Sequence, residues 1–295
     1  MAKIVKLTPY VSETVWGGDK LKQIKNLDAT NPVGETWEVA SLGEKSSCIN
    51  NIKLSELVDL SYLVKFIDTT KNLSIQVHPD DEMAAELENS KGKTECWYIM
   101  GAEEGAGIYL GFKPNITRKE FFTAVENGLA VDKYLNFIPV ARGDFFVVPG
   151  GSIHAIGSGI TLCEVQQASG ITYRVWDWNR MGLDGEPREL HIDKAKQVTN
   201  FEEAHNQKLQ EFKNLQVESG IFKLIEHADF KVQFFGQIMP KNLSLNLKAK
   251  DSLIVLDGEL EGDIKLSSFE SAIVMEAGTL EFKINKTSTF MVVSE

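Results

Sequence analysis

Cysteine is scarce in this sequence of 295 residues. The three cysteines, Cys48, Cys96 and Cys163, are scattered along the chain, and no Cys-x-x-Cys pair occurs. Such a set provides neither a disulfide framework nor a cage of thiolates for a metal ion. We therefore expect three reduced cysteines in a cytoplasmic protein.

Long apolar runs are absent as well. No stretch approaches the roughly 20 consecutive apolar residues that a membrane-spanning helix needs. The first nine residues, MAKIVKLTP, contain no small-residue cleavage site, so we expect no secretory signal. The sequence predicts a protein without a membrane partner.

An excess of positive charge is the third feature that the sequence lacks. Its formal net charge is -11, spread along the chain rather than gathered in a tail. Such a surface repels polyphosphate chains, which argues against nucleic-acid binding. A few local cations can still dominate one pocket, so a small phosphorylated substrate remains compatible with this charge.

Strand patterns dominate what is present. Short β-branched or aromatic runs, bounded by turn residues, occur in two groups. The first group comprises 143–148, 162–166 and 171–178, and the second comprises 220–225, 230–235, 252–256, 272–275 and 290–293. Many short strands at nearly even spacing are typical of a barrel or jelly roll. We therefore predict a mainly β protein.

Helical patterns are fewer and concentrate between about residues 50 and 136. They are predicted at 54–64, 80–89 and 117–127. The last begins with Thr117 as a plausible N-cap and Glu120 three residues later. The polar stretch 200–213 is the best candidate for a boundary, which predicts domains at 1–213 and 214–295.

A polar face follows the strand pattern around Gln76. Side chains alternate between the two faces of a strand, so Ser74, Gln76 and His78 are expected to project the same way. Such a face can direct ligands into a barrel mouth, or it can face solvent. Taken alone, this segment is compatible with both interpretations.

Glu95 opens an apolar strand pattern that continues to Met100. A carboxylate in that position needs a partner if it is buried, and a metal ion could provide one. The alternative is that Glu95 lies at the end of the strand in solvent. Lys93 should face the same side as Glu95. It is a candidate for a phosphate contact or for acid–base catalysis, with a solvated lysine as the alternative.

The segment from Gly143 to His154 has the form G-x5-P-x-G-x2-H. It resembles the second motif of the cupins, in which a strand, a Pro-Gly turn and a returning strand direct one histidine into a barrel. Gln76, His78 and Glu95 resemble the first cupin motif, with glutamine where most cupins have histidine. The resemblance implies a cupin jelly roll with a small helical insertion, followed by a second, degenerate cupin-like domain without metal ligands.

Several further blocks in the same order are similar to the short form of the type I mannose-6-phosphate isomerases, also called phosphomannose isomerases. These blocks are 15–21, 34–37, 63–68, 73–81, 93–98, 143–154, 164–169 and 173–175. The resemblance implies that Gln76, His78, Glu95 and His154 bind one zinc ion and that Arg174 is a catalytic arginine. The implied reaction is the isomerisation of mannose 6-phosphate to fructose 6-phosphate through an enediol.

The chemistry of these residue types agrees with that implication. Two imidazoles, a carboxylate and an amide oxygen suit Zn²⁺, and a catalytic site must leave room for substrate oxygens. The guanidinium of Arg174 can hold negative charge on oxygen or bind phosphate. The hydroxyl of Ser74 is a weaker candidate for substrate binding, and Lys93 is a candidate for both catalysis and substrate binding. No residue is assigned as the proton-transfer base.

Other interpretations use the same four ligands. The chain could be another metal-dependent cupin enzyme, such as an oxygenase or epimerase, or a non-catalytic cupin that binds a sugar phosphate. A structural cupin of the seed-storage kind is disfavoured, because it needs no such ligand set. A monomer and a homodimer are both compatible with the sequence.

Overall fold

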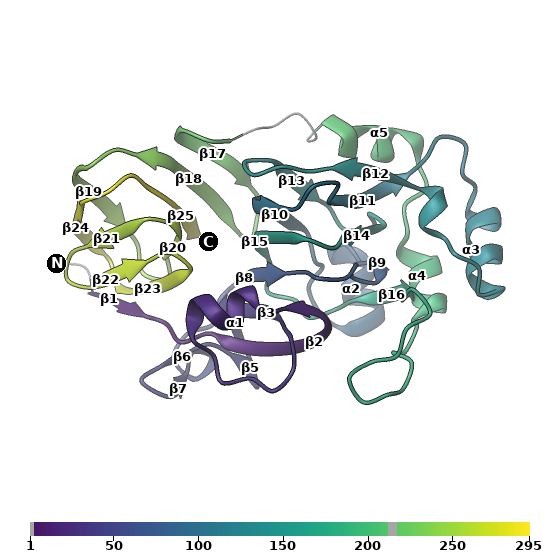
Figure 1. Ribbon diagram of the computed structural model, residues 1–295, viewed down its shortest axis with the longest axis horizontal. Helices are drawn as coiled ribbons and strands as arrows, with labels where there is room; N and C mark the ends of the chain where they lie inside the picture. The colour runs from purple at the N-terminus through teal and green to yellow at the C-terminus, as the bar shows by residue number, and fades with distance from the viewer. Residues whose placement is uncertain (1–2, 212–216) are drawn as a thin grey trace.

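The computed structural model describes residues 3–211 and 217–295. Within these residues the fold is mainly β, as predicted, and it consists of two sandwiches of antiparallel sheets (Figure 1). The predicted boundary between residues 213 and 214 lies outside the described residues.

The first sandwich pairs a six-stranded sheet with a five-stranded one. The larger sheet has the order β13 (Phe145–Val148), β10 (Glu95–Ala102), β15 (Ile160–Gln167), β8 (Tyr62–Asp68), β3 (Val33–Val39) and β2 (Tyr10–Gly18). The smaller sheet has the order β12 (Leu135–Pro139), β11 (Gly107–Phe112), β14 (His154–Ile156), β9 (Ile75–Val77) and β16 (Tyr173–Trp176). This is the jelly-roll arrangement that the strand spacing predicted.

The second sandwich includes a strand from the other end of the chain. Its larger sheet has the order β1 (Lys3–Lys6), β23 (Glu270–Glu276), β20 (Ser252–Asp257), β25 (Ser288–Ser294), β18 (Lys231–Ile238) and β17 (Gly220–Glu226). Its smaller sheet has the order β19 (Lys241–Leu247), β24 (Gly278–Ile284), β21 (Glu259–Glu261) and β22 (Lys265–Ser267). Figure 1 shows β1 lying beside β23, so the N-terminal strand is part of the C-terminal sheet.

Alternation along β10 connects the two sandwiches. Cys96 and Tyr98 point outward and pack in one core with Phe234 of the second sandwich, and the Tyr98 and Phe234 rings are 4.9 Å apart. Trp97 and Ile99 point inward to the interior of the first sandwich. The strand is therefore buried on both faces, which explains why its residues after Glu95 form a continuous apolar run.

The helices lie around the first sandwich. They are α1 (Lys20–Lys25), α2 (Asp81–Glu88), α3 (Arg118–Glu126), α4 (Ile192–Val198) and α5 (Glu203–Glu211). Short hairpins β4 (Ser41–Leu42)–β5 (Lys45–Ser46) and β6 (Cys48–Ile49)–β7 (Ile52–Lys53), and 3₁₀ turns at Leu54–Glu56 and Asp132–Tyr134, complete the described elements. No described helix has the length and apolar character of a membrane span.

Two helix predictions are confirmed and one is wrong. The predicted helices at 80–89 and 117–127 are α2 and α3, and the Thr117 hydroxyl accepts a hydrogen bond from the Glu120 amide as a helix N-cap. The helix predicted over 54–64 is a single 3₁₀ turn followed by β8. Pairing of β8 with two central strands overrides the local periodicity, because every residue of β8 is buried. Helices also lie outside 50–136, at α1, α4 and α5.

Candidate metal centre and active-site cavity

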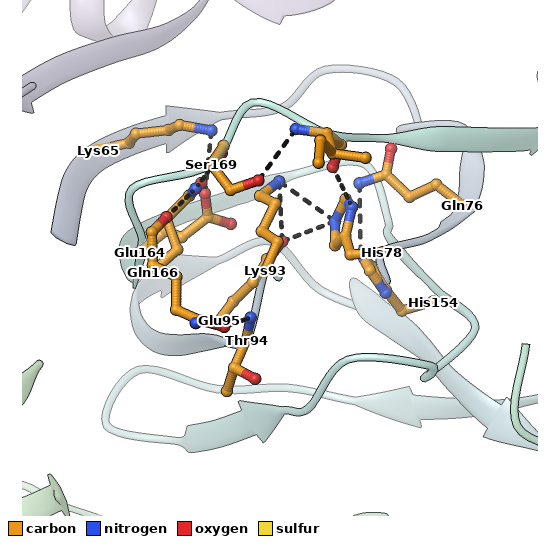
Figure 2. A network of polar contacts seen from close by, with 12 residues as sticks. Lys65, Gln76, His78, Lys93, Thr94, Glu95, His154, Glu164, Gln166 and Ser169 are labelled. Atoms are coloured by element: carbon orange, nitrogen blue, oxygen red, sulfur yellow. Dashed lines mark hydrogen bonds and ion pairs between the residues drawn. The ribbon is translucent and has the colours of Figure 1, made fainter. Parts of the chain in front are cut away.

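Four side chains predicted as ligands converge from three strands. Gln76 lies on β9, and His154, its direct partner in register, lies on the neighbouring β14. His78 follows β9, and Glu95 begins β10 in the facing sheet. Figure 2 shows these side chains turned toward one another. One ligand atom from each of His78, Glu95 and His154 lies within 4.8 Å of the others, and all three residues are buried.

The glycines of the predicted Pro-Gly turn allow this convergence. Gly151 has a φ of 82°, which disfavours other residue types, and its amide donates to the carbonyl of His78 at 2.8 Å. A Cβ on Gly150 would lie 2.7 Å from the Cα of Asp80. The turn can therefore pack directly on the chain that follows His78, which fixes His154 relative to β9.

Both histidines are held by hydrogen bonds in one tautomer. Nδ1 of His78 donates to the carbonyl of Ile171 at 2.8 Å, and Nδ1 of His154 donates to the carbonyl of Ser152 at 3.0 Å. Each Nε2 therefore keeps its lone pair and faces the other ligand side chains. This is the tautomer that metal coordination through Nε2 requires.

The electrostatics of the site fit a cation. Burial, and then the positive charge of Lys93, lower the pKa of His78 to about 3, and burial also lowers the pKa of His154. Burial opposes ionisation of Glu95, but the positive charge of Lys93 counteracts it, and the pKa of this carboxyl lies well below its usual range. The lone pair of neutral His78 thus lies 2.7 Å from an oxygen of ionised Glu95. Because two buried lone pairs repel, this arrangement favours a bound cation.

A pH dependence follows for the metal-free protein. Buried neutral histidines must take up protons when the chain unfolds in acid, so stability should fall as the pH decreases from 6.5, the ordinary histidine pKa, toward about 3. His78 alone should contribute about 1.4 kcal/mol per pH unit. Thermal unfolding in the presence of chelator at pH 7 and pH 5 should show a shallower dependence for His78→Gln than for the wild type. If Tm fell equally between pH 7 and pH 5 in both proteins, a buried neutral His78 would be contradicted.

Lys93 lies beside the ligands, as predicted. Its Nζ is 3.0 Å from Oε1 of Glu95 and 3.2 Å from Nε2 of His78. Its side chain is buried, which excludes the solvated alternative. The lysine therefore balances the charge of Glu95 and presents a proton donor at the edge of the ligand set.

A second layer of charges supports Glu95. Trp97 donates its indole N–H at 2.9 Å both to Glu95 and to Glu164. Glu164 in turn lies 3.2 Å from Nζ of Lys65 (Figure 2). Burial, and then the charge of Glu95, raise the pKa of Glu164 to about 7. Lys65 and Trp97 were not singled out from the sequence as supporting residues.

Gln76 and Glu95 of the ligand set line a polar cavity of about 330 Å³. This volume is at the lower end of the range for small-molecule sites. Its lining includes every predicted substrate contact, and the charged or hydroxyl-bearing side chains among its walls are Ser74, Lys93, Glu95, Arg174, Lys65, Glu35, Lys45, Glu164, Arg188, Thr14, Ser169 and Thr172. Ser74 donates to the amide oxygen of Gln76 at 3.2 Å, so its hydroxyl lies beside the ligand set.

Arg174 reaches the cavity from β16. Its backbone is in register with Gln76 on β9, and its NH1 donates to the carbonyl of Glu189 at 2.7 Å. Its Nε is buried without a hydrogen-bond partner among the described residues. Burial, and then the nearby charge of Arg188, lower the pKa of Arg174. Arg174 thus lies in the strand that the pattern 171–178 predicted, whereas Arg188, which lines the same cavity, was not singled out from the sequence.

Sequence comparison gives one consistent group of relatives. No protein-family model matches the sequence. The chain is 37% identical over 209 residues to mannose-6-phosphate isomerase ManA of Bacillus subtilis, which covers 64% of this chain and 66% of that protein. It is 35% identical over 234 residues to the probable mannose-6-phosphate isomerase GmuF of the same organism, which covers 72% of this chain and 74% of that protein.

Structural comparison extends the similarity over both sandwiches. The crystal structure of the mannose 6-phosphate isomerase from Bacillus subtilis matches with a TM-score of 0.83 and 26% identity, covering 100% of both chains. The cupin-like jelly roll expected from the motifs is thus confirmed. This chain belongs to the mannose-6-phosphate isomerase family.

Proposed function

We propose that this chain catalyses the reversible isomerisation of mannose 6-phosphate to fructose 6-phosphate. One zinc ion per chain would be held by Gln76, His78, Glu95 and His154. The proposal rests on one observation: a buried group of His78, Glu95 and His154 lies beside a polar cavity in a member of this family.

The donor set favours zinc. Two imidazoles, a carboxylate and an amide oxygen are ligands that zinc accepts, and none of them is a thiolate. Nε2 of Gln76 donates to Nε2 of His154 at 3.3 Å, so coordination would require the amide to rotate and present its oxygen. When bound, zinc would supply Lewis-acid polarisation of a substrate oxygen.

The reaction moves protons and consumes no oxidant or reductant. In the open-chain sugar a proton leaves C2, the enediol forms, and a proton is added at C1, while a hydroxyl proton passes from O2 to O1. We assign Arg174 to the negative charge that develops on oxygen, because a guanidinium in a buried wall is a preorganised donor. We assign Lys93 to proton transfer at a substrate oxygen and Ser74 to a hydrogen bond with the substrate, since both line the cavity beside Glu95 and Gln76.

We propose that the two domains, divided near residue 213, have different tasks. The second sandwich packs its apolar side chains on the outer face of the sheet that carries Glu95, which supports a stabilising role. The free cysteines Cys48, Cys96 and Cys163 suit a cytoplasmic enzyme. We propose a monomer or a homodimer as the active species.

The direct test is a coupled assay of fructose 6-phosphate formation by the purified protein. We expect turnover of mannose 6-phosphate that disappears with a chelator and returns with Zn²⁺ but not with Mg²⁺, because imidazole ligands select against Mg²⁺. A fully zinc-loaded protein that binds the sugar phosphate without turning it over would instead be a non-catalytic binding protein.

A further inference from the structure

Three arginines gather around one aspartate where the chain leaves β16. Asp177 is 6% exposed, and its carboxylate accepts two hydrogen bonds from Arg188, at 2.7 and 2.6 Å. Arg180 donates to the same carboxylate at 2.8 Å. Arg174 lines the same cavity as Arg188, and burial and then the charge of Arg188 lower the pKa of Arg174.

This cluster carries an excess of positive charge. Arg180 and Arg188 share a single buried carboxylate, and among the described residues no carboxylate lies within ion-pair distance of Arg174. The cluster therefore has a net charge of plus two, in a chain whose formal net charge is -11. A phosphate monoester at neutral pH carries nearly the opposite charge.

The two buried lysines of the cavity do not share this excess. Lys65 lies between the carboxylates of Glu164 and Glu35, at 3.2 and 3.9 Å, and Lys93 lies 3.0 Å from Glu95. Arg174 and Arg188 line the same cavity. Since the charges of Lys65 and Lys93 are already balanced by carboxylates, an anionic group of a ligand gains more beside the arginines than beside these two lysines.

Hydrogen bonds hold both ends of the chain segment that carries Arg188. The amide of His191 donates to the carbonyl of Arg174 at 2.8 Å, and the amide of Arg174 donates to Nδ1 of His191 at 3.2 Å. NH1 of Arg180 donates to the carbonyl of Asn72 at 2.6 Å. Arg188 is therefore held in place before a ligand arrives, which reduces the entropy cost of binding.

We propose that Arg188 binds the phosphate group of the substrate at the wall of the cavity that it shares with Arg174, and that Asp177 is a positioning residue that orients Arg188. The inference rests on the proposed function, and it adds Arg188 and Asp177 to the residues that recognise the sugar phosphate. A guanidinium suits this task because its planar array of donors matches phosphate oxygens.

The test compares Arg188→Ala with a matched control, Arg142→Ala. Arg142 pairs with Asp257 at 3.2 Å on the surface, with its side chain 57% exposed, and it does not line the cavity. For Arg188→Ala we expect about a 10- to 100-fold rise both in KM for mannose 6-phosphate and in the inhibition constant of inorganic phosphate, with a smaller change in kcat. Arg142→Ala should leave all three within about twofold of the wild type.

Two further variants keep the test decisive. Arg188→Lys retains the charge but loses the planar array, so it should show a smaller rise in both constants even if the alanine variant does not fold. Asp177→Asn should raise both constants while kcat at saturating substrate is retained, whereas a merely structural role would lower Tm without changing the inhibition constant. Unchanged constants in folded Arg188 variants would overturn the proposal.

Calorimetric titration with inorganic phosphate separates this inference from the proposed function, because binding needs no turnover. Phosphate binding that weakens in Arg188→Ala supports the subsite even in a wild type that does not isomerise mannose 6-phosphate. Conversely, an active wild type whose phosphate affinity is the same in Arg188→Ala retains its function and loses this subsite.

Discussion

Replacing His154 with alanine should lower kcat/KM for mannose 6-phosphate by roughly 10³-fold, because polarisation by a bound metal is worth several kcal/mol. His154 is 1% exposed and lies directly opposite Gln76 in the strand register. Among the described residues the ligand group contains one other histidine, His78, which already supplies a ligand atom of its own. The zinc content of the purified variant, measured by mass spectrometry, should fall from one per chain toward zero.

His227→Ala is the matched control for this prediction. The His227 ring stacks on Phe230 in the second sandwich, with its centroid 5.2 Å away, and lies outside the ligand group. Its loss should change kcat/KM by less than about threefold, compared with the roughly 10³-fold fall expected for His154→Ala. A His154→Ala variant that keeps both zinc and full activity would exclude the proposed metal centre.

Replacing Lys65 with methionine should destabilise the protein by about 3 to 5 kcal/mol, because it leaves buried carboxylates without their cation. Burial works against the charge of Lys65, but Glu35 and Glu164 outweigh this effect and raise its pKa, so the lysine is charged in the folded protein. Its ammonium also lies 4.8 Å from the ring of Trp37. We expect a fall in Tm of about 6 °C or more, measured by thermal unfolding at neutral pH.

Lys265→Met provides the comparison on the surface. Lys265 lies 3.0 Å from Glu259, but its side chain is 60% exposed, so solvent screens the pair and the variant should lower Tm far less than Lys65→Met does. Adding Glu164→Gln to Lys65→Met should recover part of the lost stability, because the double variant leaves one fewer unpaired charge. Equal Tm losses for the two lysine variants would show that Lys65 does not hold the buried carboxylates.

Much of the candidate site could be predicted from local sequence. The alternation of side chains along one strand placed Gln76 on a polar face, and the Pro-Gly turn placed His154 on a returning strand, of which it is the first residue. These patterns are local because neighbouring residues in a strand alternate and a glycine-dependent turn has few solutions. Lys93 was placed on the side of Glu95 by the same rule, and its contact with Glu95 confirms that placement.

The supporting charges could not be predicted in the same way. Lys65 stands between Val64 and Phe66 in an apolar strand, which is a signal that a buried partner exists, but the sequence does not say which residue that partner is. Arg188 has no such signal, because it lies in a polar stretch that reads as a loop. Its bond to Asp177, 11 residues earlier, depends on how the chain returns to β16.

The sequence by itself determined the mainly β class and the two groups of strands, and its motifs indicated the candidate ligand residues, because alternation, turn chemistry and motif spacing act over short stretches of chain. Only the tertiary structure decided that β8 is a strand rather than a helix, that β1 joins the C-terminal sheet, and which charges surround Glu95 and Arg174. Those outcomes depend on burial and on pairing between residues far apart in the chain, and such energies exist only once the sheets have packed together.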